Sequence, residues 1–171
     1  MPLRRTRRHP GFDYWGPHAY FVTICTNRRR RIFEDAVFAR DAIAKLLRSA
    51  SAHRFALPAY CLIPDHAHVV AVGQHDNSQL TTFIKSWNTQ TGFAWRQAFR
   101  FVDRPEPLWQ PGYHDHVLRE GESILGVARY VVLNPVRSGI VADPTDYEFT
   151  GSTQYTIQQI LEAADDWRPL K

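Results

Sequence analysis

The sequence predicts an α+β fold of the ferredoxin-like, split β-α-β type, with an antiparallel sheet and a further C-terminal helix that carries a tyrosine. Short segments rich in β-branched and aromatic residues alternate with longer segments whose apolar residues recur at helical spacing. Their order is strand, helix, strand, strand, helix, strand, helix. The 171 residues, of which 44% are hydrophobic, suffice for one packed core and are few for two, so we expect a single domain.

The first half of the chain supplies three strands and one helix. Residues 19–26 (AYFVTICT) are aromatic and β-branched, which predicts a buried strand. Residues 35–52 place apolar side chains three and four positions apart, which predicts an amphipathic helix. Residues 55–63 and 66–72 predict two more strands, and the turn dipeptide Pro64-Asp65 between them indicates a hairpin.

The second half supplies two helices and one strand. Residues 78–99 predict a helix with Ser78 as its N-terminal cap. Residues 113–119, which follow a loop with three prolines, predict the last strand. Residues 120–134 predict a third helix, with acidic residues in its first turn and a stop at Pro135.

We expect the single domain, residues 1–171, to have three parts. These are a basic arm (1–18), a core (19–141) and a tail (142–171), and residues 157–164 of the tail predict a short helix. The start of the chain has no apolar run suited to a signal peptide, and no stretch is long enough to span a bilayer. We therefore expect a cytoplasmic protein with no membrane partner.

The two cysteines, Cys25 and Cys61, lie far apart in the sequence, and each is in an apolar segment. They lack the paired spacing of a zinc ribbon or a redox motif. We expect both to be reduced residues of the core.

Basic residues are concentrated at the start of the chain. The net charge is +4, yet residues 1–32 carry +7, because they hold eight arginines and one acidic residue. Arginine supplies 18 of the 21 basic residues, and a guanidinium can bind phosphate oxygens bidentately. This charge indicates a polyanionic partner, although a solubilising arm would have the same composition. The eight arginines are Arg4, Arg5, Arg7, Arg8, Arg28, Arg29, Arg30 and Arg31.

Two histidines stand two positions apart in the predicted strand LIPDHAHVVAV. Side chains alternate along a strand, so His66 and His68 project from one face and can bind one metal ion, while Ala67 faces the core. The plainer interpretation is two half-exposed histidines on an edge strand. A rival pair, His114 and His116, has the same spacing, but ranks second because the residue between them is an aspartate.

The third helix carries a tyrosine outside its apolar stripe. At about 100° per residue, Tyr130 and Asn134 fall together on the side opposite to the apolar arc. Positions i and i+4 share a face, so both side chains can address one point. A tyrosine oxygen near a metal ion is suited to attack on a phosphodiester, with a phosphotyrosine that retains the bond energy. The plainer interpretation is that Tyr130 caps a core and Asn134 ends the helix.

The motifs PDHAHVV and, about sixty residues later, ARYVVLNPVRSGIV together resemble the HUH single-tyrosine transposases, in particular the REP-associated tyrosine transposases. The resemblance extends over RRTRRHPGFDYWGPHAYFVTICT, FIKSWN and LWQPGYHDHVLRE, from about Arg4 to Val141. This chain departs from the usual family motif at Asp65, where asparagine is common, and at Ala67, which is a small residue for that position.

The resemblance implies a catalytic centre and its cofactor. It implies His66 and His68 as metal ligands, Tyr130 as the nucleophile and Asn134 as the third ligand through its side-chain oxygen. The implied ion is Mg²⁺ or Mn²⁺: imidazoles favour Mn²⁺ in vitro, and abundance favours Mg²⁺ in cells.

The resemblance also implies the partner, which is single-stranded DNA with a hairpin of the REP palindrome type, cut near the hairpin. We expect phosphate contacts from the arginines of the arm and from residues 28–31, and base stacking by the aromatic side chains. Such a protein would be nucleoid-associated and would act as a monomer or a homodimer. The further candidates for DNA contact are Lys85, Trp109, Tyr113 and Arg119.

Two other functions compete with a tyrosine transposase. One is a catalytically silent binder of structured single-stranded DNA. The other is a metal-dependent phosphoesterase that activates water, with Tyr130 in a structural role. Only the transposase predicts a covalent protein-DNA adduct.

Overall fold

The computed structural model describes residues 11–99, 106–163 and 167–168. Five strands form one antiparallel sheet in the order β4-β1-β3-β2-β5. The strands are β1 (Ala19–Cys25), β2 (Phe55–Ile63), β3 (His66–Gly73), β4 (His114–Val117) and β5 (Thr150–Gly151). The predicted ferredoxin-like fold is confirmed, and it leaves β3 in the centre of the sheet.

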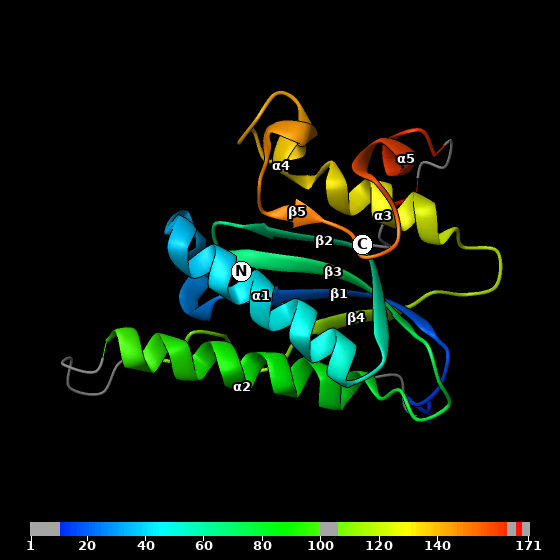
Figure 1. Ribbon diagram of the computed structural model, residues 1–171, viewed down its shortest axis with the longest axis horizontal. Helices are drawn as coiled ribbons and strands as arrows, with labels where there is room; N and C mark the ends of the chain where they lie inside the picture. The colour runs from blue at the N-terminus through cyan, green and yellow to red at the C-terminus, as the bar shows by residue number, and fades with distance from the viewer. Residues whose placement is uncertain (1–10, 100–105, 164–166, 169–171) are drawn as a thin grey trace.

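Helices cover both faces of the sheet (Figure 1). On one face lie α1 (Ala36–Ala52) and α2 (Leu80–Ala98), which also pack against each other. On the other face lie α3 (Ile124–Val132), α4 (Asn134–Arg137) and α5 (Ile157–Leu161). Short 3-10 turns occur at η1 (Asn27–Arg29), η2 (Ile32–Glu34) and η3 (Pro144–Asp146).

Each face of the sheet has its own apolar cluster, because strand residues alternate between the two faces. On β3, Ala67, Val69 and Ala71 belong to the cluster under α1 and α2, and Val70 belongs to the cluster under α3. The strand is therefore buried on both sides, whereas the sequence predicted one polar face.

The β2–β3 hairpin is formed as predicted. Ile63 pairs with His66, so Pro64 and Asp65 form a two-residue turn. The register of the hairpin sets which side of the sheet each histidine occupies. Asp65 consequently stands directly beside the first histidine of β3.

The helix starts differ from the predicted ones. The third helix begins at Ile124, with Ser123 as its cap, and its first turn holds no acidic residue. Ser78 does not cap α2: its hydroxyl donates to the carbonyl of Arg54, and Gln79 occupies the cap position. A tertiary bond of Ser78 thus decided the start of α2, whereas a local cap by Ser123 decided the start of α3.

Other differences lie at the edges of the sheet and in the tail. The strand β5 was not predicted, and β4 is shorter than expected. The tail helix ends at Leu161 rather than at residue 164, which lies outside the described residues. Both cysteines are buried and free, as predicted. No helix among the described residues is long and apolar enough to cross a membrane.

Candidate functional site

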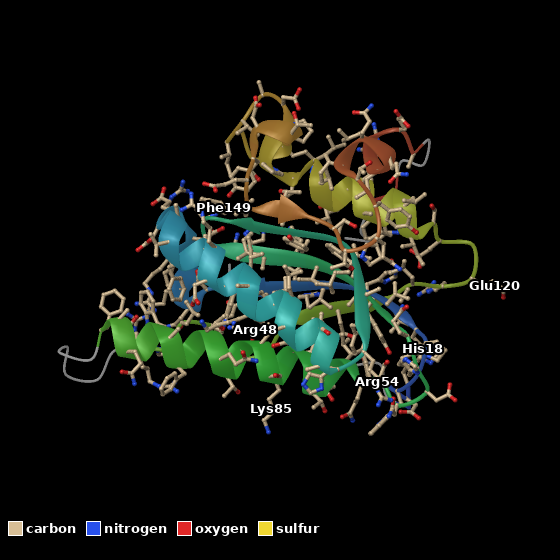
Figure 2. All side chains as sticks on the ribbon, viewed as in Figure 1. His18, Arg48, Arg54, Lys85, Glu120 and Phe149 are labelled. Carbon is tan, nitrogen blue, oxygen red and sulfur yellow. The ribbon has the colours of Figure 1, made fainter. Side chains whose placement is uncertain are left out.

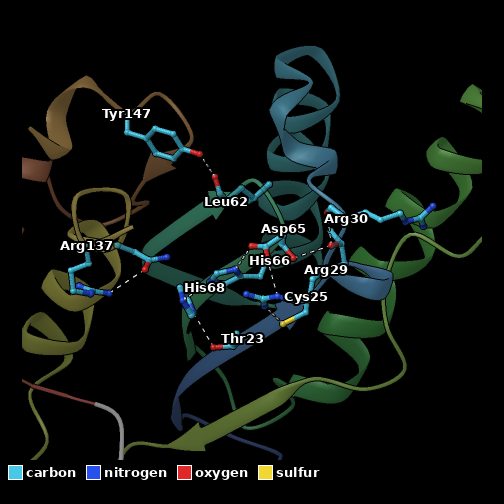
Figure 3. Close-up of polar contacts among 12 residues, drawn as sticks. Thr23, Cys25, Arg29, Arg30, Leu62, Asp65, His66, His68, Arg137 and Tyr147 are labelled. Carbon is cyan, nitrogen blue, oxygen red and sulfur yellow. Dashed lines mark hydrogen bonds and ion pairs between the residues drawn. The ribbon is translucent and has the colours of Figure 1, made fainter. Parts of the chain in front are cut away.

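The central strand β3 places two imidazoles under α3. His66 and His68 lie on the sheet face opposite to Ala67, with their Nε2 atoms 3.1 Å apart. Figure 3 shows the two rings beside each other at the end of the β2–β3 hairpin. The pair predicted from the spacing is thus brought to one point.

A hydrogen-bond partner fixes the far side of each imidazole ring. Nδ1 of His66 lies 2.7 Å from Oδ1 of Asp65, and Nδ1 of His68 lies 2.8 Å from Oγ1 of Thr23 on β1. An ionised carboxylate only accepts, so Nδ1 of His66 carries the proton and its Nε2 offers a lone pair. The Thr23 hydroxyl can donate or accept, so His68 can adopt either tautomer.

Burial keeps both imidazoles neutral. It lowers the pKa of His66, against the raising effect of the hydrogen bond to Asp65. Burial also brings the pKa of His68 well below its ordinary value, and the neighbouring His66 and Arg137 act in the same direction. Neutral imidazoles are the form that binds metal ions.

The tyrosine of α3 lies beside this pair. The ring of Tyr130 is half-buried, with its centroid 6.4 Å from that of His68 and 5.8 Å from that of Phe21. The guanidinium carbon of Arg137 lies over the same ring, 3.8 Å from its centroid, and Nη1 donates to the Tyr130 carbonyl at 2.6 Å. The guanidinium of Arg137 is therefore held against the face of the Tyr130 ring.

The helix-angle prediction for Tyr130 and Asn134 needs a correction. Both were expected on the side away from the apolar arc, yet Asn134 is only 6% exposed and Tyr130 packs towards the sheet. The reason is that α3 is buried on two sides, by the sheet and by α5. Asn134 also lies beyond the end of α3, at the first position of α4, so the angles of one continuous helix do not describe both residues.

Asn134 is the first residue of α4, and one of its side-chain polar atoms lacks a hydrogen-bond partner. Its Oδ1 accepts from Nη2 of Arg137 at 3.3 Å. Its Nδ2 is buried and has no hydrogen-bond partner in the described part of the chain. A buried polar atom without a partner is costly, so a bound hydrogen-bond acceptor or a rotated amide would stabilise this side chain.

These residues fit a divalent cation. The two Nε2 atoms, 3.1 Å apart, are close enough for both imidazoles to bind one ion. An amide oxygen from Asn134 would suit the same hard ion. Within the described residues no group of three or more His, Cys, Asp or Glu side chains could hold a metal ion.

In the rival histidine pair, His116 has a carboxylate as its partner. On the edge strand β4, Nε2 of His116 binds the carboxylate of Glu122 at 2.9 Å, and Trp167 donates to the same carboxylate at 2.8 Å. His114 is opposite Thr23 on the same face of the sheet. The lower rank of this pair stays a prediction.

The arginines of the η1 turn bind acidic and carbonyl groups of the chain itself. Arg28 and Arg30 pair with Glu106 at 2.7 and 3.6 Å, and Arg31 pairs with Glu34. Arg29 pairs with Asp65 at 2.9 Å and so reaches the histidine pair. Arg4, Arg5, Arg7 and Arg8 lie outside the described residues.

The other candidates for DNA contact are scattered. The prediction that Trp109 stacks on a base is wrong. The residue is only 8% exposed, its ring packs on Trp87, and its indole N–H donates to the Thr91 hydroxyl. Lys85 points away from the sheet on α2 (Figure 2), and α2 covers the sheet face opposite to the histidines. Lys85 and Tyr113 line a cavity of about 730 Å³, and Arg119 is exposed in the loop after β4.

Four contacts of this site were missed from the sequence. Thr23 and Arg29 hold the site from distant segments, Arg137 holds it from α4 directly after α3, and Trp167 of the tail packs edge-on against Tyr130 with centroids 5.4 Å apart. Only Arg137 carried a signal, since it is the basic residue of the NPVR segment. The others depend on contacts between segments far apart in the chain.

A ferredoxin-like sheet with paired histidines under a tyrosine helix defines the class of HUH single-tyrosine transposases. The chain belongs to the IS200-like transposase family, whose profile matches residues 16–133. It is 23% identical over 133 residues to the REP-associated tyrosine transposase of Escherichia coli K12, covering 77% of this chain and 73% of that protein. It also resembles, with a TM-score of 0.70 and 19% identity, the structure of a REP-associated tyrosine transposase bound to a REP hairpin, over 97% of this chain and 94% of that one.

Proposed function

We propose that this transposase is a metal-dependent endonuclease and strand transferase that cuts single-stranded DNA near palindromic hairpins through a 5′-phosphotyrosine. One observation carries the proposal. The Nε2 atoms of His66 and His68 converge to 3.1 Å beside the ring of Tyr130, within one chain. Paired neutral imidazoles next to a tyrosine supply a cation site and a nucleophile together.

In the proposed mechanism Tyr130 is the nucleophile. Its phenol oxygen bonds to the scissile phosphorus and loses its proton to solvent, and the bond from phosphorus to the 3′ oxygen breaks. The 3′ end leaves as a hydroxyl, and a later hydroxyl reverses the exchange and releases the tyrosine. Mg²⁺ or Mn²⁺ held by the two imidazoles and Asn134 would polarise a non-bridging phosphate oxygen.

Arg137 has a positioning role in this proposal. Its guanidinium contacts the Tyr130 ring and carbonyl and the Asn134 amide at once. A delocalised cation in this place favours negative charge on the tyrosine oxygen and on an approaching phosphate.

The proposed partner is a DNA hairpin of the REP type, which would make the protein nucleoid-associated. The structural relative bound to a REP hairpin supports this partner. The surplus of arginine near the start of the chain supports binding to phosphates.

The test is a covalent adduct. The protein is incubated with a hairpin oligonucleotide carrying a single-stranded flank, with Mn²⁺, and then denatured. We expect a protein-DNA species that is lost in Tyr130→Phe and in His66→Ala, while hairpin binding persists in both. A silent binder would retain hairpin affinity and form no adduct, and a water-activating phosphoesterase would cut without an adduct.

We further propose that one chain suffices for cleavage, because α3 packs on the sheet of its own chain. A mixture of Tyr130→Phe and His66→Ala protomers tests this. We expect no restored adduct in the mixture. Restored activity would show instead that two chains exchange the tyrosine helix.

A further inference from the structure

An ion pair stands directly behind one of the two imidazoles. Oδ1 of Asp65 binds Nδ1 of His66 at 2.7 Å, and Oδ2 of the same carboxylate forms an ion pair with Nε of Arg29 at 2.9 Å. Figure 3 shows the order guanidinium, carboxylate, imidazole along these contacts. Both oxygens of the carboxylate are thus engaged, one by each partner.

The backbone around Arg29 is arranged to make this contact. Arg28 and Arg29 have φ of 56° and 55°, in the left-handed region that non-glycine residues rarely adopt. The Thr26 backbone N–H donates to the carbonyl of Asp65 at 2.9 Å, and the Thr26 hydroxyl lies 3.0 Å from that carbonyl and 2.6 Å from the carbonyl of Arg30, so the two turns are joined. Nη1 of Arg29 also donates to Sγ of Cys25 at 2.7 Å. A strained turn held in this way points to a specific task for the Arg29 side chain.

We propose that Asp65 and Arg29 form a charged pair that positions His66 as a metal ligand, an inference that rests on the proposed metal site. The carboxylate fixes the proton on Nδ1 and strengthens the electron donation of Nε2 to a cation. Arg29 holds the carboxylate in this orientation, so that Asp65 does not rotate to bind the cation itself.

Arg29 has a second effect on the charge of the site. A lone carboxylate next to the histidines would repel the phosphate of a DNA substrate. The guanidinium compensates this charge while leaving the hydrogen bond to His66 intact. This assigns Arg29 to the metal site, whereas the sequence predicted direct phosphate contact.

The test is Mn²⁺ binding by isothermal titration calorimetry on the full chain, without DNA, for folded variants checked by circular dichroism. We expect Asp65→Ala to weaken Mn²⁺ binding about 10- to 100-fold. Asp65→Asn, which keeps an acceptor oxygen, should weaken it less, and Arg29→Gln should weaken it severalfold.

Arg28→Gln is the matched control. It lies in the same turn, has the same left-handed backbone and carries the same charge, but its guanidinium pairs with Glu106 at 2.7 Å. We expect its Mn²⁺ affinity to equal that of the wild type.

The outcomes separate this inference from the proposed function. Mn²⁺ binding that requires His66 but is unchanged by Asp65→Ala and Arg29→Gln overturns the inference and leaves the metal site in place. Equal binding in the wild type and His66→Ala overturns both. The Arg29→Gln variant can also lose affinity for the hairpin in EDTA while its Mn²⁺ affinity is unchanged. That result would show that Arg29 binds phosphate directly, and it would overturn the inference.

Discussion

Replacing Thr23 by valine probes how the second imidazole is held. The Thr23 hydroxyl lies 2.8 Å from Nδ1 of His68 and is the partner of that nitrogen in both tautomers. Without metal, the Nε2–H of His68 can donate to Nε2 of His66, 3.1 Å away, while Thr23 donates to Nδ1. When His68 binds a metal ion through Nε2, its proton is on Nδ1, and the Thr23 hydroxyl accepts a hydrogen bond from that N–H.

The expected effect follows from this change of role. Valine has nearly the shape of threonine but leaves the buried N–H of metal-bound His68 without a partner, at a cost of about 1–3 kcal/mol. The metal-free chain loses a hydrogen bond as well, which offsets part of that cost. We therefore expect Mn²⁺ affinity to fall about tenfold, equivalent to about 1.4 kcal/mol.

The assay is calorimetric titration with Mn²⁺, with Thr23→Ser as the control that keeps the hydroxyl. The serine variant should stay close to the wild type. An unchanged affinity in Thr23→Val would refute the reasoning, because it would show that the orientation of His68 does not depend on this bond.

Three further predictions concern catalysis, stability and pH. Arg137→Met should lower the rate of adduct formation about tenfold, because it removes the cation over Tyr130, while Arg137→Lys should restore part of it in a single-turnover assay. Trp109→Phe should destabilise the fold by about 1–3 kcal/mol in urea unfolding and leave hairpin affinity intact; weaker DNA binding at full stability would contradict its buried position. Burial lowers the pKa values of His66 and His68, so below pH 6.5, the ordinary pKa of histidine, the unfolded chain binds more protons than the folded chain. The free energy of unfolding of the metal-free protein should therefore fall as the pH falls through about 6.5, and it should fall less steeply when both histidines are replaced by glutamine. An unfolding free energy that stays constant from pH 7 to about pH 5 would contradict this prediction.

Much of the architecture could be predicted because it is encoded locally. The alternation of side chains placed His66 and His68 on one face, and Pro64-Asp65 marked the turn that precedes them. Helical and strand periodicities likewise gave the element order. Each of these signals involves residues that are neighbours in the chain.

The errors arose where one segment meets another. The position of Trp109 beside an apolar strand did not reveal that Trp87 of α2 covers its ring. The charge of the η1 arginines did not reveal their partners Glu106 and Asp65. In both cases the deciding neighbour is distant in the sequence.

Local patterns in the sequence therefore sufficed for the fold class, the histidine pair and the tyrosine helix. Packing between elements brings Tyr130 of α3 beside His68, and it places Thr23, Arg29 and Arg137 against the groups of the site. Periodicity specifies only which face a side chain occupies. What that face contacts depends on the packing of all elements together.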